Sequence, residues 1–336
     1  MVSIMIPICI TIGLFSKNKN TIIFRFSTLA VYGNTMDSIK IAKWAGRHIA
    51  YMPLFLADRM GLFAAQDLDV TIYDAGNDND IFSEVAKGRA QFGVGDPVFV
   101  ALGQRQGFDT RVVASIVGNV PMWGITHHSE IKSFTHISDF VGLRVGSFPK
   151  PSTAYTMLSA LKARNPRLLK SMRIIETEIG QQAYLLASDQ VDLILELEPL
   201  VSMTQRQGLR VVCSMSDFYP DFLMTGLMTS ASMIAASPDV VGKVVRGIQQ
   251  ALTIIHAQPD KAAAIGCELF PSINANIMNE AVQRMIASHA WPEQAVISPQ
   301  GWANTLKMRQ DVGELTALPP FDSVVDQRFA YAVLET

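Results

Sequence analysis

The stretch HIAYMPLFLADRMGLFAAQDLDV, residues 48–70, combines a helical pattern with a strand that follows it closely. Apolar side chains recur at helical spacing at Leu54, Ala57, Met60 and Phe63, which predicts a helix over about 51–65. The next segment, LDVTIY, has the pattern of a strand. A helix joined this tightly to a strand is typical of an α/β protein.

The alternation of strands and helices begins at residue 38 and starts afresh near residue 141. Two extended apolar stretches, 120–128 and 221–230, flank the second unit, and VDLILELE and LRVVCSM within it are predicted as successive strands. Beyond residue 230 the pattern is helical, over 238–257, 259–268, 274–288 and 299–313. The sequence therefore predicts two α/β units with largely parallel sheets flanked by helices.

Composition excludes several classes of function. The chain has 336 residues, a net charge of −2 and 49% hydrophobic residues, which indicates a folded protein without a basic face for nucleic acid. Its three cysteines, Cys9, Cys213 and Cys267, lie far apart and form no CxxC pattern. Buried thiols are therefore favoured over a disulfide framework or a zinc site, and no metal or cofactor is expected.

The first 36 residues do not follow the α/β pattern. The apolar run MIPICITIGLF is shorter than the roughly 20 residues that span a bilayer, and no Lys or Arg precedes it as in an ordinary signal peptide. Two alternatives stay open: an atypical export or anchor segment, or an extension upstream of a start at Met36. The first predicts a periplasmic or membrane-associated extracytoplasmic protein, and the second a cytoplasmic one.

Three segments resemble the nitrate/sulfonate/taurine and thiamine-pyrimidine group of substrate-binding proteins of ABC transporters. They are YMPLFLADRMGLFAAQDLDVTIY (51–73), EVAKGRAQFGVGDPVFVAL (84–102) and ISDFVGLRVGSFPKPSTAYTML (137–158). The order and spacing of these segments carry the resemblance, which covers about residues 38–330. The chain departs from the pattern at Asp67, where the group has glycine, and at Gln91, where it usually has an acidic residue.

The resemblance implies a two-lobed type II periplasmic-binding-protein fold, in which each lobe is a mostly parallel sheet flanked by helices and two crossing strands join the lobes. The expected boundaries are 37–125 and 225–336 for the first lobe and 126–224 for the second. Ligands bind beyond the carboxyl ends of the strands in such sheets, so the loops that enter the helices should line a cleft between the lobes.

Ten residues are predicted to bind a ligand, and each has a structural alternative such as packing, capping or an ion pair. They lie in the loops at the strand ends or in the two crossings: Trp44, His48, Tyr51, Asp96, Trp123, Ser152, Thr153, Tyr155, Glu198 and Thr225. Asp96 also fits a helix cap before Pro97. Trp123, in the first crossing, offers a flat ring for a flat ligand, or else packs at the hinge.

The resemblance implies a monomeric protein that captures a small solute by hinge closure and delivers it to an ABC permease and its ATPase. The candidate loops carry Arg47 and Lys150 beside several carboxylates and aromatic rings, which favours an organic solute, such as a sulfonate, a pyrimidine or a related heterocycle. Contact with a membrane is expected only through the permease or an N-terminal anchor. A sensory or regulatory ligand-binding protein without a transporter remains an alternative.

An enzyme resembling the thiamine-pyrimidine synthases is the second alternative. Those enzymes have a Lys that holds pyridoxal phosphate, a His and a cysteine-rich iron segment. The Lys and His fall in the segment that here reads GVGDPVFVAL, which contains neither. The second crossing, FLMTGLMTS, contains no Cys. The sequence therefore favours a binding protein over an enzyme.

Overall fold

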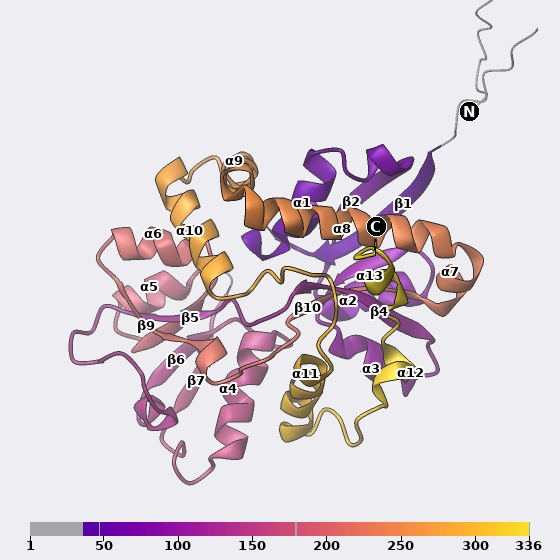
Figure 1. Cartoon of the computed structure of the whole chain (residues 1–336). Coiled ribbons are helices and arrows are strands. Elements are labelled where there is room, and N and C mark those ends of the chain that lie inside the picture. Colours follow the sequence, from indigo (N-terminus) through magenta and orange to yellow (C-terminus); the bar gives the residue numbers. More distant parts are fainter. Residues whose placement is uncertain (1–35, 47, 179, 336) are drawn as a thin grey trace, which may run out of the picture. The chain divides into compact units, whose positions relative to one another are not determined.

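The structure, a computed structural model, describes residues 36–46, 48–178 and 180–335 (Figure 1). Its strands form two five-stranded sheets, with the orders β2-β1-β3-β10-β4 and β7-β6-β8-β5-β9. The first sheet contains β1 (Asp37–Trp44), β2 (Leu68–Gly76), β3 (Phe92–Gly95), β4 (Thr110–Val117) and β10 (Thr225–Ser230). The second sheet contains β5 (Trp123–Thr126), β6 (Arg144–Ser147), β7 (Arg173–Glu176), β8 (Leu193–Glu196) and β9 (Arg210–Ser214).

Each sheet is parallel except for one strand. In the first sheet β10 is antiparallel to β3 and β4, and in the second sheet β5 is antiparallel to β8 and β9. These two strands are those at which the chain enters the second sheet and returns to the first. The expectation of mostly parallel sheets joined by two crossing segments is therefore confirmed. The two sheets also have the same strand order, with β6, β7, β8, β9 and β5 in the places that β1, β2, β3, β4 and β10 take in the first sheet.

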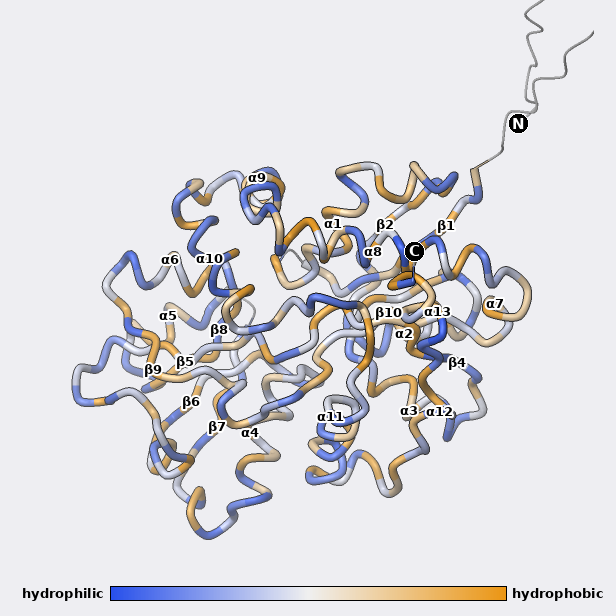
Figure 2. The backbone as a smooth tube through the Cα atoms, viewed as in Figure 1, coloured by the Kyte–Doolittle hydropathy of each residue, from blue (hydrophilic) through white to orange (hydrophobic). Residues whose placement is uncertain are grey.

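Helices cover both faces of the first sheet. Ile39 and Ile41 of β1 belong to the same apolar core as α1 and α8, whereas Ala42 belongs to the core formed with α2 and α3. This follows from the alternation of side chains along a strand. Helix α8, the longest, presents both hydrophobic and hydrophilic residues along its length (Figure 2). The helices that precede the second sheet are α1 (Met52–Arg59), α2 (Asp78–Ala86) and α3 (Val98–Gln104).

The remaining helices accompany the second sheet or follow β10. Those beside the second sheet are α4 (Thr153–Arg164), α5 (Gln182–Ala187) and α6 (Leu200–Arg206). Those after β10 are α7 (Ala231–Ala236), α8 (Pro238–Ala257), α9 (Pro259–Leu269), α10 (Ala275–Ala287), α11 (Pro299–Asp311), α12 (Phe321–Val324) and α13 (Arg328–Ala332). None of the helices in the described ranges is both long and apolar enough to cross a membrane.

Two local predictions from the sequence differ from the structure. The helix expected over 51–65 ends at Arg59 because Gly61 adopts a positive φ of 68°, and a separate 3-10 turn, Ala64–Gln66, leads into β2. Helix α6 lies between VDLILELE and LRVVCSM, which were predicted as successive strands. The alternatives for residues 1–35 lie outside the described residues.

The two sheets are connected by more than the crossing segments at 118–122 and 215–224. Helix α10 packs against α6, and α11 packs against α4, so two helices that follow the first sheet's last strand contact helices of the second sheet. Residues at or directly after the ends of β1, β3 and β6 lie around a shared interior space.

Candidate functional site

A cavity of about 90 Å³ lies where both sheets and both crossing segments meet. The first sheet and its following loops and helices contribute Trp44, His48, Ala50, Tyr51, Asp78 and Asp96. The second sheet and its following loops and helices contribute Phe148, Ser152, Thr153, Ala154 and Leu197, the crossings contribute Pro121, Met122 and Met224, and β10 contributes Thr225. The cavity therefore has aromatic walls and a small number of polar groups, as small-molecule sites usually do.

Seven of the ten residues predicted from the sequence line this cavity: Trp44, His48, Tyr51, Asp96, Ser152, Thr153 and Thr225. Their roles toward a ligand stay predictions. Asp78 also lines the cavity and is not among the ten predicted residues. It lies in the loop and first turn that follow β2, where Asn77 caps α2, so the segment GNDND has the pattern of an ordinary helix start.

His48 lies between two aromatic neighbours at the start of the loop into α1. Its ring centroid is 5.4 Å from that of Trp44 and 4.3 Å from that of Tyr51. Burial lowers the pKa of His48 to about 4, with the nearby charge of Lys43 adding to the effect, so its imidazole is neutral at pH 7. Its Nδ1 atom is inaccessible to solvent and has no hydrogen-bond partner among the described residues. A ligand in the cavity could supply that partner.

Asp96 is the centre of a buried polar network. Its carboxylate accepts hydrogen bonds from Thr153 Oγ1 at 2.8 Å and from Val98 N at 3.0 Å, and it forms an ion pair with Arg309 of α11. The bond from Val98 N is the helix-capping role that the sequence allowed for Asp96. Because Thr153 begins α4 beside the second sheet, the network also joins the two sides of the cavity.

Asp78 lies next to this network without a cation of its own in the described part of the chain. Its Oδ1 accepts a hydrogen bond from Asp96 N at 2.8 Å. Burial raises the pKa of Asp78 to about 6, and the negative charge of Asp96 raises it further than Arg309 lowers it. The Asp78 carboxyl is therefore easier to protonate than an ordinary aspartate, and of the two charged groups among the described lining residues it is the one without an ion pair.

The second sheet closes the cavity through the start of α4. Ser152 caps this helix by accepting from Tyr155 N at 3.3 Å, and its hydroxyl donates to Phe148 O at 3.0 Å. Thr225 is buried at the first position of β10. The described lining residues include no Lys or Arg. Lys150 lies 4.5 Å from the Tyr155 ring centroid, with its side chain 60% exposed, and Arg47 lies outside the described residues.

Trp123, Tyr155 and Glu198 lie away from the cavity. Trp123 is buried in β5, and the guanidinium of Arg284 lies 5.8 Å from the centroid of its ring. Trp123 and Arg284 line a different, open groove of about 500 Å³ beside Asn119 and the 216–221 segment.

Glu198 has the contacts of a structural carboxylate. It accepts from Arg284 Nε at 2.6 Å, from Ser202 Oγ at 2.8 Å and from Ser202 N at 3.0 Å. The ion pair is one of the structural alternatives expected for this residue, and the bonds to Ser202 join Glu198 to the first turn of α6. Burial raises the pKa of Glu198, and its bonds to Ser202 and Arg284 oppose that rise.

The sequence model described as NMT1/THI5 like matches residues 48–262. The riboflavin-binding protein RibY of Chloroflexus aurantiacus is 22% identical over 287 residues, which cover 83% of this chain and 77% of that protein.

Two solved structures are similar in fold. The periplasmic aliphatic sulphonate binding protein SsuA of Escherichia coli superposes with a TM-score of 0.70 at 13% identity, covering 87% of this chain and 92% of SsuA. The desulfurization enzyme DSZB superposes with a TM-score of 0.64 at 13% identity, covering 89% of this chain and 99% of DSZB. The TM-scores show that the fold is shared. At identities this low the ligand has to be inferred from the residues of the cavity.

Proposed function

The chain belongs to the NMT1/THI5-like family, and on this premise we propose that it is the solute-binding component of an ABC importer. In this role it captures a small organic solute outside the cytoplasm and delivers it to a membrane permease that is driven by an ATPase. Two similar proteins, named as riboflavin-binding and as aliphatic sulphonate binding, support a binding role.

We infer the class of solute from the charge of the cavity wall. Among the described lining residues the charged groups are Asp78 and Asp96, and the Arg309 guanidinium forms an ion pair with Asp96. A nitrate or sulfonate anion would meet uncompensated negative charge at Asp78. A heterocycle with N–H donors, neutral or cationic, would instead bond to Asp78 and His48 and lie against the rings of Trp44, Tyr51 and Phe148.

The small volume implies that the sheets move apart to admit a solute. A cavity of about 90 Å³ holds only a few water molecules, whereas pockets for drug-sized ligands measure about 300–1,000 Å³. The crossings at 118–122 and 215–224 are where such a rotation would occur. Contacts from a bound ligand to both walls would then favour the closed arrangement.

Catalysis is the alternative function, because the desulfurization enzyme DSZB shares this fold. Cys213 does not support it: burial raises the pKa of its thiol to about 12, and it packs in β9 against Gly124, away from the cavity. The cavity residues, a neutral imidazole and two hydrogen-bonded carboxyl groups, fit recognition of a donor-rich ring.

A thermal-shift screen of the full chain would test the solute class. The panel contains pyrimidines, flavin-type rings and aromatic amines on one side and alkanesulfonates and nitrate on the other. We expect the melting temperature to rise with a member of the first group, since a ligand at a hundredfold excess over its Kd stabilises by about 2.7 kcal/mol. The substitution Asp78→Asn should weaken that binding at least tenfold, whereas Asp69→Asn, at an exposed site on β2, should not.

Two results would contradict the proposal. Stabilisation by alkanesulfonates or nitrate alone would overturn the solute class while preserving a binding role. Turnover of a panel compound by the purified protein would replace binding by catalysis. Genes for a permease and an ATPase beside this one would favour import over sensing.

A further inference from the structure

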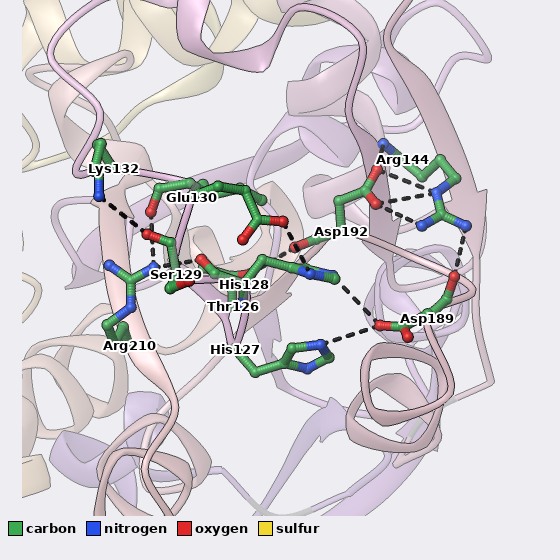
Figure 3. Close-up of polar contacts among 11 residues, drawn as sticks. Thr126, His127, His128, Ser129, Glu130, Lys132, Arg144, Asp189, Asp192 and Arg210 are labelled. Atoms are coloured by element: carbon green, nitrogen blue, oxygen red, sulfur yellow. Dashed lines mark hydrogen bonds and ion pairs between the residues drawn. The ribbon is translucent and has the colours of Figure 1, made fainter.

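A cluster of two histidines and a carboxylate lies at the far end of β5 from Trp123, and its residues are not among those that line the candidate cavity. Figure 3 shows this cluster. His127 and His128 follow β5 directly, and Asp189 lies in the turn after α5. The Nε2 atoms of His127 and His128 are 3.1 and 3.6 Å from Asp189 Oδ1, and one ligand atom from each of the three residues lies within 4.8 Å of the others.

Hydrogen bonds that do not use the ligand atoms hold both segments in place. Thr126 Oγ1 donates to Asp192 O at 2.7 Å and accepts from His128 N at 3.1 Å. Arg144 donates to Asp189 O at 2.6 Å and also pairs with the carboxylate of Asp192 (Figure 3). The backbone at His128 and Asp189 is thus fixed, while His127 Nε2 and Asp189 Oδ1 form a hydrogen bond at 3.1 Å that a bound ion would replace.

The two ring nitrogens of His128 have different surroundings. Its Nε2 atom is inaccessible to solvent and makes no hydrogen bond within the described residues. On the opposite side of the ring, Nδ1 lies 3.5 Å from Glu130 Oε1. A carboxylate near one ring nitrogen, with the other nitrogen directed at the metal, is the usual arrangement of a metal-bound histidine.

We propose that His127, His128 and Asp189 bind one divalent transition-metal ion of the zinc class. Imidazole nitrogens with a carboxylate oxygen suit Zn²⁺ better than Mg²⁺ or Ca²⁺, which prefer oxygen ligands. Two ligands about 2.1 Å from a tetrahedral zinc ion are about 3.4 Å apart, close to the separations of 3.1 and 3.6 Å found here. Water completes the coordination, with Glu130 orienting His128.

The sequence alone predicted no metal site because Asp189 is 61 or 62 residues from the two histidines, and a HisHis pair has no ligand spacing of its own. The positive φ of 55° at Asp189 forms the turn that directs this residue toward β5. A simple set of histidine–aspartate ion pairs is the competing interpretation, and it requires no metal.

Titration calorimetry of the metal-free full chain with ZnCl₂ separates these interpretations. We expect one Zn²⁺ per chain in the wild type and an affinity at least tenfold lower in Asp189→Asn and His128→Gln. Asn retains the geometry of Asp189 and tolerates a positive φ. His289→Asn is the matched control, because His289 is exposed, also has a positive φ and lies outside the cluster. It should bind Zn²⁺ like the wild type.

A second measurement shows whether the ion sits among nitrogen and oxygen ligands. Co²⁺ in place of Zn²⁺ should give the strong visible absorption of a four-coordinate ion, and Asp189→Asn should lose it while retaining the wild-type circular dichroism. Absence of stoichiometric Zn²⁺ binding in the wild type would overturn the proposal. So would equal affinities in the wild type, Asp189→Asn and His128→Gln.

Discussion

Arg309 and Asp96 form an ion pair in which the two side chains are only 2% and 3% exposed, although 213 residues separate them in the sequence. Arg309 also donates to Thr156 Oγ1 at 3.0 Å and to Glu314 Oε2 at 2.9 Å. The guanidinium therefore connects α11 to the end of β3 and to α4. A charge buried this deeply is compensated only while all of these partners stay in place.

We expect Arg309→Met to destabilise the protein by about 3–5 kcal/mol, because it leaves the Asp96 carboxylate buried without its cation. Arg89→Met is the matched control: Arg89 pairs with Glu84 but its side chain is 52% exposed, so its loss should leave stability close to that of the wild type. Urea unfolding followed by circular dichroism gives both values. Equal small losses in the two variants would show that Arg309 contributes no more than a surface residue.

Glu196 should make folding stability depend on pH. Burial raises its pKa to about 7, and the charge of Glu198 acts in the same direction. A carboxyl whose pKa is higher in the folded state favours folding below its unfolded pKa of about 4.3, and this contribution is lost as the pH rises through 7. The wild type should therefore lose about 1–3 kcal/mol relative to Glu196→Gln between pH 4.5 and 7.5.

Urea unfolding across that pH range measures this difference, with Glu178→Gln, at an exposed position, as the control. If the stability of Glu196→Gln followed that of the wild type at every pH, Glu196 would have the same pKa in the folded and unfolded chains.

Trp123 should matter for stability more than for binding. It is buried in β5 beside Arg284 and does not line the candidate cavity, a position that favours hinge packing over stacking on a ligand. Trp123→Ala should lower the free energy of unfolding by about 3–5 kcal/mol and leave the Kd for a solute within a few-fold. Trp44→Ala, in the cavity wall, should show the opposite pattern. Paired urea unfolding and calorimetric titration would detect a reversal of these roles.

Asp78 should control how solute affinity changes with pH. Its carboxyl, whose pKa burial raises to about 6, is mostly protonated at pH 5 and mostly ionised at pH 7. A cationic solute should therefore bind more tightly as the pH rises from 5 to 7, and Asp78→Asn should remove the dependence. A neutral donor ring should show a weaker slope. If the affinity for a cationic solute fell between pH 5 and pH 7, Asp78 would not be part of the binding site for that solute. Titration calorimetry in matched buffers measures each case.

Much of the fold follows from local sequence signals. The helix predicted at 238–257 matches α8 at both ends, because Pro238 begins it and its apolar residues recur at helical spacing. Helix α6 was not predicted because it has only seven residues and begins after Pro199, at the end of a continuous apolar strand pattern. Short helices of this kind depend on packing, here against α10, more than on their own propensity.

The contacts of the candidate site could be predicted from the sequence only in part. The position of Asp96 at the end of β3 could be recognised from the FGVGDP segment, but its pairing with Arg309 depends on how α11 packs, which no local pattern encodes. Asp78 had the appearance of a residue in a capped helix start. Trp123 follows the first crossing as the first residue of β5, and only the three-dimensional register of β5 shows that its ring faces the open groove and not the cavity.

The position of β10 between β3 and β4 has a consequence for the order of events during synthesis. All strands of the second sheet lie within residues 123–214, so a growing chain can complete that sheet from a continuous segment. The first sheet must wait for residues 225–230 to leave the ribosome, because its interior strand is the last one made. Until then β3 and β4 have unpaired edges, and the amino-terminal half of the nascent protein is the part most in need of protection from aggregation.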